Sequence, residues 1–280
     1  MEHFFKTILV PTDFSESATG AVHYAVELAK KTKAKLVLLH AFFVPELVAD
    51  VTAVMPSYAD INATSENSLK HLKAEILATH GKEMKIEAIA VEGGPVEETE
   101  RYLNEHRVDL VVMGMKGTSY FDERLFGSAA TKMMHLANCP VLMVDKDVVF
   151  RPIKKIVLAS DYARVQYLHD QLAPLVKLTE LFNAKVLILN VTPQQYSTLS
   201  MDEAIAGVHL DHVLAKVPHT FHQIEHEDIV EGIKAFARDQ KADVLVMMPR
   251  EHSLLERLFR EPNTKQMAFH AGLPLLTIHE

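Results

Sequence analysis

A glycine-containing segment, residues 114–128, combines residue types that could hold a polyphosphate. It reads GMKGTSYFDERLFGS, so three glycines follow the spacing G-x2-G-x9-G and a serine comes next. Glycines at 114 and 117 permit positive φ and close backbone approach, so amide N–H groups can converge on phosphate oxygens. Gly127 and Ser128 open a predicted helix, whose N-terminus presents unpaired N–H groups and the positive end of the helix dipole.

A second polar group, Pro11-Thr12-Asp13, directly follows a short apolar run at residues 8–10. It offers a hydroxyl and a carboxylate. In an open parallel sheet, ligands bind beyond the carboxyl ends of the strands, where neighbouring connections diverge. Asp13 has two interpretations: it contacts a ligand or a bound Mg²⁺, or it caps the following helix, a role that Ser15 could also fill.

Strands and helices alternate around these two groups. Continuous apolar runs predict strands buried on both faces, which are typical of parallel sheets; they lie at residues 8–10, 36–39, 110–113 and 141–144. A strand at residues 86–91 alternates more and is expected at a sheet edge. Helical spacing predicts helices from Ser15 to Thr32 and at residues 67–79, 96–105 and 128–137. This order predicts an α/β fold with right-handed crossovers.

The chain repeats this order of elements. The segment ILVPTD at residues 8–13 has the counterpart IVLASD at residues 156–161, and ERLF at residues 123–126 recurs at residues 256–259. A chain of 280 residues is long enough for two ordinary domains. We therefore predict two domains, residues 1–147 and 152–280, divided where charge and proline interrupt the pattern.

On these motifs the chain resembles the universal stress protein family, and in particular its ATP-binding branch, which carries G-x2-G-x9-G-[ST] after the fourth strand. The likeness covers residues 4–146 strongly and residues 153–280 more weakly. It implies two tandem flavodoxin-like or Rossmann-like domains, each a five-stranded parallel sheet of order 3-2-1-4-5 flanked by helices. It also implies ATP, with Mg²⁺, lying across the first and fourth strands.

Site roles follow from the resemblance, position by position. Asp13 would meet the ribose hydroxyls or the Mg²⁺ of Mg-ATP, and Pro11, Thr12 and Ala41 would frame the adenine. The ribose and phosphates would be cradled by Met113, Gly114, Lys116, Gly117, Gly127, Ser128 and Ala129.

The second half departs from the motif at the expected binding site. Residues 248–252, MPREH, replace the first two glycines, and residues 260–262, REP, stand where Gly127-Ser128-Ala129 would be. Proline lacks an N–H, bulky side chains block close approach, and Glu261 repels phosphate. We therefore expect ATP in the N-terminal domain only.

The leading functional hypothesis is a nucleotide-dependent stress-response or regulatory protein that is not an enzyme, because no second carboxylate, arginine finger or positioned base is evident. The alternative is a slow ATP hydrolase or nucleotidyl-transfer enzyme. A phosphate-receiver switch is disfavoured, because residues 91–94, VEGG, lack a phosphoacceptor aspartate after the third strand. A different small ligand in the second domain remains open, given Arg250, His252 and Arg260.

The composition of the chain bears on which partners it binds and in which cellular compartment it lies. The net charge of −8, without clustered Lys and Arg, argues against nucleic acid as a partner. The sequence has no run of 18 apolar residues, so it predicts no membrane span. A single cysteine, Cys139, and no evident signal peptide favour the cytoplasm. Residues 209–226 are rich in histidine and could bind a metal, but a structural role is favoured.

The assembly is also an expectation from the resemblance. The family pairs through its fifth strand, so residues 141–144 and 275–278 are expected to join the two domains as an internal pseudo-dimer. A further homodimer and an unidentified protein partner are left open.

Overall fold

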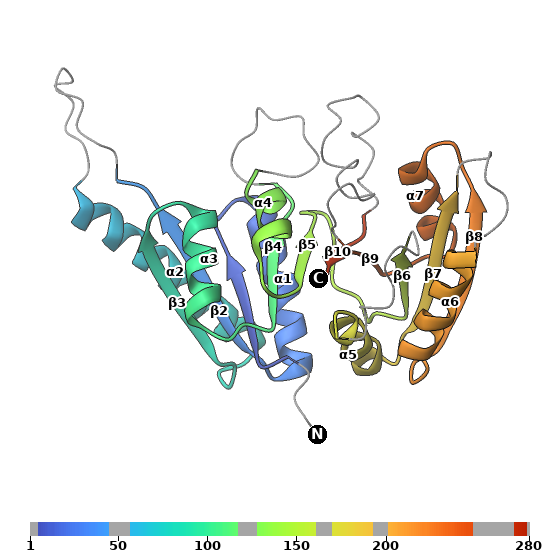
Figure 1. Ribbon diagram of the computed structural model, residues 1–280. Coiled ribbons are helices and arrows are strands. Elements are labelled where there is room, and N and C mark those ends of the chain that lie inside the picture. Colours follow the sequence, from blue (N-terminus) through green and yellow to red (C-terminus); the bar gives the residue numbers. More distant parts are fainter. Residues whose placement is uncertain are drawn as a thin grey trace, which may run out of the picture.

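The computed structural model describes residues 5–44, 57–116, 128–160, 170–192, 201–248 and 272–278. Within them, ten strands form one sheet of order β3-β2-β1-β4-β5-β10-β9-β6-β7-β8 (Figure 1). The strands are β1 (Thr7–Pro11), β2 (Lys35–Phe42), β3 (Ile86–Glu92), β4 (Leu110–Gly114), β5 (Val141–Val144), β6 (Lys155–Ala159), β7 (Lys185–Thr192), β8 (His219–Glu225), β9 (Val244–Met247) and β10 (Leu275–Thr277). The predicted order 3-2-1-4-5 is confirmed in both halves, and β3 lies at an edge as expected.

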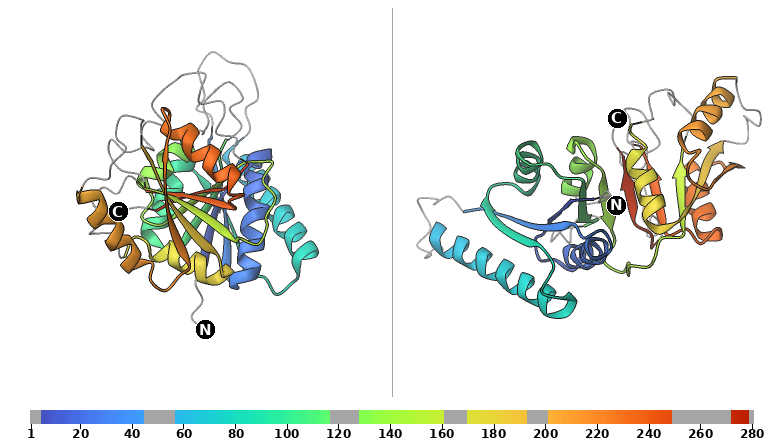
Figure 2. Two further views of the ribbon diagram at one scale, coloured as in Figure 1. Left: turned by 90° about the vertical axis from the view of Figure 1, so that its right-hand side faces the viewer. Right: turned by 90° about the horizontal axis from the view of Figure 1, so that it is seen from below.

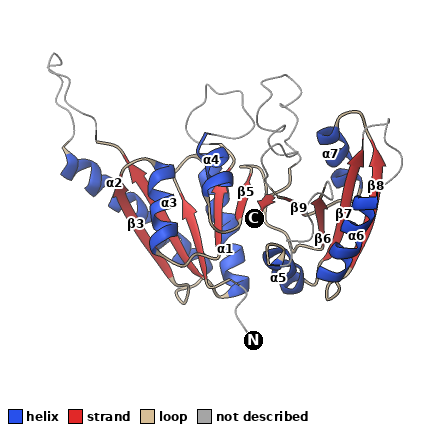
Figure 3. Cartoon of the chain, viewed as in Figure 1, coloured by secondary structure: helices blue, strands red, loops and turns tan. Residues whose placement is uncertain are grey.

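Helices flank the sheet on both faces (Figure 3). The described helices are α1 (Glu16–Thr32), α2 (Tyr58–His80), α3 (Pro95–Glu105), α4 (Ser128–Leu136), α5 (Ala173–Phe182), α6 (Met201–Val213) and α7 (Ile229–Asp239). One core cluster unites residues of α1, α2, α5 and α6, and another unites residues of α3, α4 and α7. Both clusters run through the two domains. In the described part of the chain, no helix is long and apolar enough to cross a membrane.

The strands divide their side chains between these two clusters. Ile8 and Val10 of β1 pack in the first cluster and Leu9 in the second, because successive side chains of a strand point to opposite faces. All three are fully buried. The continuous apolar runs of the sequence therefore mark strands covered on both sides, as predicted.

Helix α2 is longer than the sequence pattern indicates. It begins at Tyr58, whereas apolar spacing predicted a start near residue 67. Ser57 caps it: the Ser57 side chain accepts from Asp60 N–H, and the Asp60 side chain accepts from Ser57 N–H at 3.0 Å. Its buried residues are Ser65, Leu69 and Ile76, so its first two turns bury no apolar side chain. The capping box, rather than apolar periodicity, sets this boundary.

The two domains join through their fifth strands. β5 and β10 pair antiparallel, with Val141 opposite Thr277 and Met143 opposite Leu275, whereas every other neighbouring pair is parallel. The predicted internal joint at residues 141–144 and 275–278 is thus confirmed. The buried Thr277 hydroxyl donates to the Val141 carbonyl at 3.2 Å. The sheet continues through the joint and twists across both domains (Figure 2).

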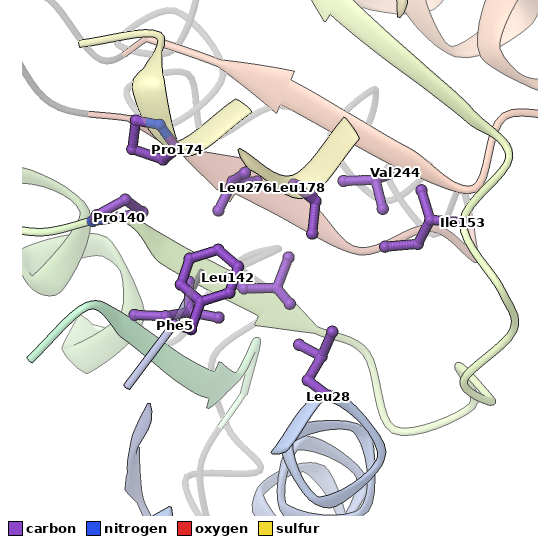
Figure 4. Close-up of a pocket in the computed structure, with 10 residues that line it drawn as sticks. Phe5, Leu28, Pro140, Leu142, Ile153, Pro174, Leu178, Val244 and Leu276 are labelled. Carbon is purple, nitrogen blue, oxygen red and sulfur yellow. The ribbon is translucent and has the colours of Figure 1, made fainter. Parts of the chain in front are cut away.

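A small apolar pocket remains beside this joint (Figure 4). Phe5, Leu28 and Leu142 line it from the first domain, and Ile153, Leu178 and Leu276 line it from the second. Its cavity volume is about 10 Å³, which is barely enough for one water molecule. The pocket is a packing gap between domains.

Candidate functional site

The sequence-predicted residues gather where the connections of two neighbouring strands diverge. β1 and β4 are adjacent and parallel, so their carboxyl ends, Pro11 and Gly114, lie at one edge of the sheet. Helix α1, which follows β1, packs in one core cluster, whereas α4, which follows β4, packs in the other. In open α/β sheets, ligands bind beyond the strand ends at such a divergence.

The turn after β1 is held by a chain of local hydrogen bonds. Thr12 N–H donates to the Leu39 carbonyl at 2.8 Å, and the Thr12 hydroxyl accepts from Phe14 N–H at 3.1 Å. The Asp13 carboxylate accepts from Ser15 N–H at 3.0 Å. Ser15 is the N-cap of α1, its hydroxyl accepting from Ala18 N–H at 3.2 Å. Of the two capping candidates, Ser15 therefore caps the helix, and the exposed Asp13 sits just ahead of it.

His40 and Phe14 support this turn from the side of β2. His40 Nδ1 donates to the Thr12 carbonyl at 2.8 Å, since a carbonyl oxygen can only accept. Phe14 has a φ of 60°, an unusual value for a bulky residue, and its ring lies 4.6 Å from that of His40, centroid to centroid. The backbone that presents Thr12 and Asp13 is therefore tightly determined.

Gly114 lets the first turn of α1 approach the end of β4. A Cβ at this position would lie 2.5 Å from Ser17 Oγ and 2.7 Å from the Ser17 carbonyl carbon. Gly114 lies in β4 and does not have a positive φ. A glycine is needed at this position because of the close contact with Ser17. The Ser17 hydroxyl in turn accepts from Lys116 N–H at 3.2 Å. The two predicted binding segments are thereby fastened to each other.

The other described candidates lie at or near the ends of their helices and strands. Ser128 is the exposed first residue of α4, and Ala129 follows it. Ala41 stands near the end of β2, the strand beside β1. Met113 is 7% exposed and packs in the core, so its backbone is what the site can use. Gly117 and Gly127 lie outside the described residues.

Three residues that support the site were not predicted from the sequence, namely Phe14, Ser17 and His40. Ser17 and His40 act on atoms 99 and 28 residues away, which no local spacing reveals. The available signal was a polar residue, His40, that follows the apolar run at residues 36–39 of β2.

The second domain repeats the scaffold of this site with different side chains. Ser160 N–H donates to the Leu189 carbonyl at 2.9 Å, and the Asn190 amide donates to the Ser160 carbonyl at 3.1 Å. Asn190 therefore takes the place of His40. Asn190 Oδ1 and Thr192 Oγ1 are buried and have no hydrogen-bond partner among the described residues. Met248, after β9, occupies the position of Gly114; Asp161 and residues 249–252 and 260–262 lie outside the described residues.

The histidines of residues 209–226 are spread over several elements. His209 and His212 lie on α6, His219 and His222 on β8, and His226 follows β8. His219 Nε2 lies 3.0 Å from Asp211 Oδ1, and burial lowers the pKa of His222. Among the described residues, no group of three His, Cys, Asp or Glu is placed to hold a metal ion.

Cys139 lies away from these strand ends, just before β5. It is buried, and burial raises its pKa to about 12. Such a thiol is protonated near neutral pH and is a poor nucleophile.

Comparison with known families matches both halves of the chain. The model of the universal stress protein family matches residues 4–145 and again residues 153–279. A universal stress protein of Methanocaldococcus jannaschii is 30% identical over 158 residues, covering 52% of this chain and 85% of that protein. One from Bacillus subtilis is 31% identical over 146 residues, covering 50% of this chain and 99% of that protein. Each of these relatives thus corresponds to about half of the chain.

Among solved structures, a universal stress protein from Archaeoglobus fulgidus matches the whole architecture. The alignment covers 99% of this chain and 98% of that one, with a TM-score of 0.71 and 18% identity. At this identity the match shows the shared tandem fold.

Proposed function

Because the chain belongs to the universal stress protein family, we propose that it is a stress-response or regulatory protein whose first domain binds Mg-ATP. The observation that carries the proposal is the contact between Gly114 and Ser17, with Ser17 also holding Lys116 N–H. This contact fixes the start of the glycine segment against the turn that bears Asp13. A phosphate chain lying along this edge would meet backbone N–H groups and the N-terminus of α4.

The residues would divide the nucleotide among them. Pro11, Thr12 and Ala41 frame the base at the ends of β1 and β2. Asp13, exposed at the mouth, meets the ribose hydroxyls or Mg²⁺. Lys116 and Ser128, together with Gly117 and Gly127, serve the phosphates, where Mg²⁺ would neutralise part of the charge.

ATP is proposed for the first domain alone. In the second domain a methionine, Met248, stands where Gly114 admits close contact in the first. The following sequence has Pro249 without an N–H and Glu261 with a charge that repels phosphate.

We propose binding without rapid turnover, so that nucleotide occupancy changes contacts with a protein partner. The Asp13 carboxylate already accepts from Ser15 N–H at 3.0 Å, which suits a residue that positions rather than activates water. Slow hydrolysis is the alternative. Release of radiolabelled phosphate far above that of Asp13→Ala would favour the enzyme.

Titration calorimetry with Mg-ATP tests the proposal. The wild-type chain is expected to bind, and Gly127→Val to fold but lose at least about 100-fold in affinity, because valine removes the backbone freedom that a glycine gives to a phosphate-binding motif. Gly207→Val is the matched control, since a Cβ at Gly207 meets nothing within 4 Å. No binding by the wild type, or equal binding by Gly127→Val, would contradict the proposal.

A further inference from the structure

Phe43, the residue after β2, is an exposed aromatic residue close to the proposed position of the base. It is 68% exposed, whereas Phe42 is 6% exposed and its ring lies 6.0 Å from that of Tyr58, centroid to centroid. A single exposed apolar side chain is ordinary, so its position decides what it can do. Phe43 lies two residues beyond Ala41, which the proposed function places against the base.

The alternation of β2 places Phe43 on the face of the sheet where α3 and α4 pack. Leu39 packs in the core cluster that contains residues of these two helices. Ala41 and Phe43 continue the same alternation, although β2 itself ends one residue before Phe43. A Cβ built on Gly94, the N-cap of α3, would lie 3.7 Å from Phe43 Cζ, which is an ordinary contact. The ring therefore lies between the end of β2 and the start of α3.

This position continues the line along which the proposed nucleotide would lie. β4, β1 and β2 are neighbouring parallel strands, so their carboxyl ends follow one another along one edge of the sheet. The phosphates are proposed at the end of β4, Asp13 follows β1, and Ala41 lies near the end of β2. Two strand spacings separate β4 from β2, which is about 10 Å. A nucleotide with its phosphates at the start of α4 would thus extend towards Phe43.

The charges at the starts of the two helices favour the same direction. The first turn of α3 carries Glu97 and Glu98, whereas the first turn of α4 carries no acidic residue. Phosphate is attracted to a helix N-terminus without carboxylates and repelled by one that carries two. The uncharged base is the part of a nucleotide that fits beside α3, where Phe43 lies.

The second domain differs from the first at both of these positions. Its sequence has Pro193 in place of Phe43 and Asp228 in place of Gly94. Asp228 caps α7, its carboxylate accepting from the N–H groups of residues 230 and 231 at 2.9 and 3.2 Å, whereas Gly94 offers α3 no side-chain cap. The second domain therefore has neither the aromatic ring nor the glycine beside it, and ATP is proposed only for the first.

We propose that Phe43 is a binding residue of the first domain and that its ring stacks on the base of the nucleotide. The inference rests on the proposed function, because it needs a nucleotide at the carboxyl ends of β1 and β4. An aromatic side chain can stack on any base, since every base has a π-face. Phe43 would thus add affinity through the base and none through the phosphates.

Titration calorimetry of the full chain with Mg-ATP, and in parallel with Mg-tripolyphosphate, separates the base from the phosphates. Phe43→Ala and Phe43→Leu should each weaken ATP binding about 10-fold, whereas Phe43→Tyr should keep it, because only tyrosine preserves the ring. Binding of tripolyphosphate should not change. Phe221→Ala is the matched control, since Phe221 is a 41% exposed phenylalanine of the second domain. Wild-type ATP affinity in Phe43→Ala, or an equal loss for tripolyphosphate, would overturn the proposal.

A tryptophan at position 43 reports the stacking directly. The chain contains no tryptophan, so Phe43→Trp introduces a single indole. Its fluorescence should change with Mg-ATP at the same concentrations that give heat, and should not change with Mg-tripolyphosphate. Phe221→Trp should respond to neither. Heat of ATP binding by Phe43→Trp without a change in fluorescence would overturn the stacking and leave the ATP site standing, whereas no heat from the wild type would overturn both.

Discussion

The first and second domains hold their strands with matching hydrogen bonds. The Asp109 carboxylate accepts from Lys6 and Thr7 N–H groups at 2.8 and 2.9 Å, and that of Asp243 accepts from Lys154 and Lys155 at 2.7 and 2.9 Å. At the carboxyl ends of the strands the domains differ, with Gly114 and His40 in one and Met248 and Asn190 in the other. Equivalent aspartates thus hold the first strand of each domain in the same way, whereas the residues at the proposed binding site differ between the domains.

The largest effect is expected from making the first domain resemble the second at residue 114. Gly114→Met should cost about 3 kcal/mol of unfolding free energy, since its side chain would start 2.5 Å from Ser17 Oγ and 2.7 Å from the Ser17 backbone. ATP binding should be lost with it. Urea unfolding measures the cost, with Gly207→Met as the control in open space. Wild-type stability in Gly114→Met would mean that the close contact does not distinguish the domains.

A similar loss in both domains is expected at the shared aspartates. Asp109→Ala and Asp243→Ala should each cost about 2 kcal/mol, because each removes a charged acceptor from two backbone N–H groups. Urea unfolding of the two variants gives the comparison. A cost confined to one of them would show that the scaffold is not held equally in the two domains.

Exchanging the side chains that support the turns should have a smaller effect. His40→Asn and Asn190→His each keep a donor for the carbonyl of Thr12 or Ser160, so each should change stability by less than about 1 kcal/mol. His40→Leu and Asn190→Leu remove the donor and should cost more. If the exchanges cost as much as the leucine variants in thermal unfolding, the hydrogen bond is not what these positions share.

The smallest effect is a pH dependence specific to the second domain. Burial lowers the pKa of His222, so the unfolded chain takes up this proton at a higher pH than the folded chain. The free energy of unfolding should therefore fall as pH drops from about 7 to about 5. His222→Ile, which copies Ile89 at the corresponding position of β3, should reduce this slope. Identical slopes for variant and wild type would contradict the assignment.

Much of the fold could be predicted because burial on both faces leaves a strong pattern. Residues 8–10 and 141–144 read as continuous apolar runs and form β1 and β5. The start of α2 could not be found in this way, since its first two turns bury no apolar side chain and only the Ser57–Asp60 capping box marks it.

The sequence predicted which segments form the site but not the contacts between them. The motif identified Asp13, Gly114 and Ser128, but the reason for glycine at 114 depends on Ser17, which reaches it through tertiary packing. The His40 bond to Thr12 likewise joins two strands. Such contacts appear only once the order of strands is known.

Native mass spectrometry of the full chain in Mg-ATP tests the central claim most directly, because it counts nucleotides per chain. We expect one ATP on the wild-type chain and none on Gly127→Val, with both proteins folded. Two nucleotides per chain, or one that persists in Gly127→Val, would contradict a site confined to the first domain, and none on the wild type would contradict ATP binding itself.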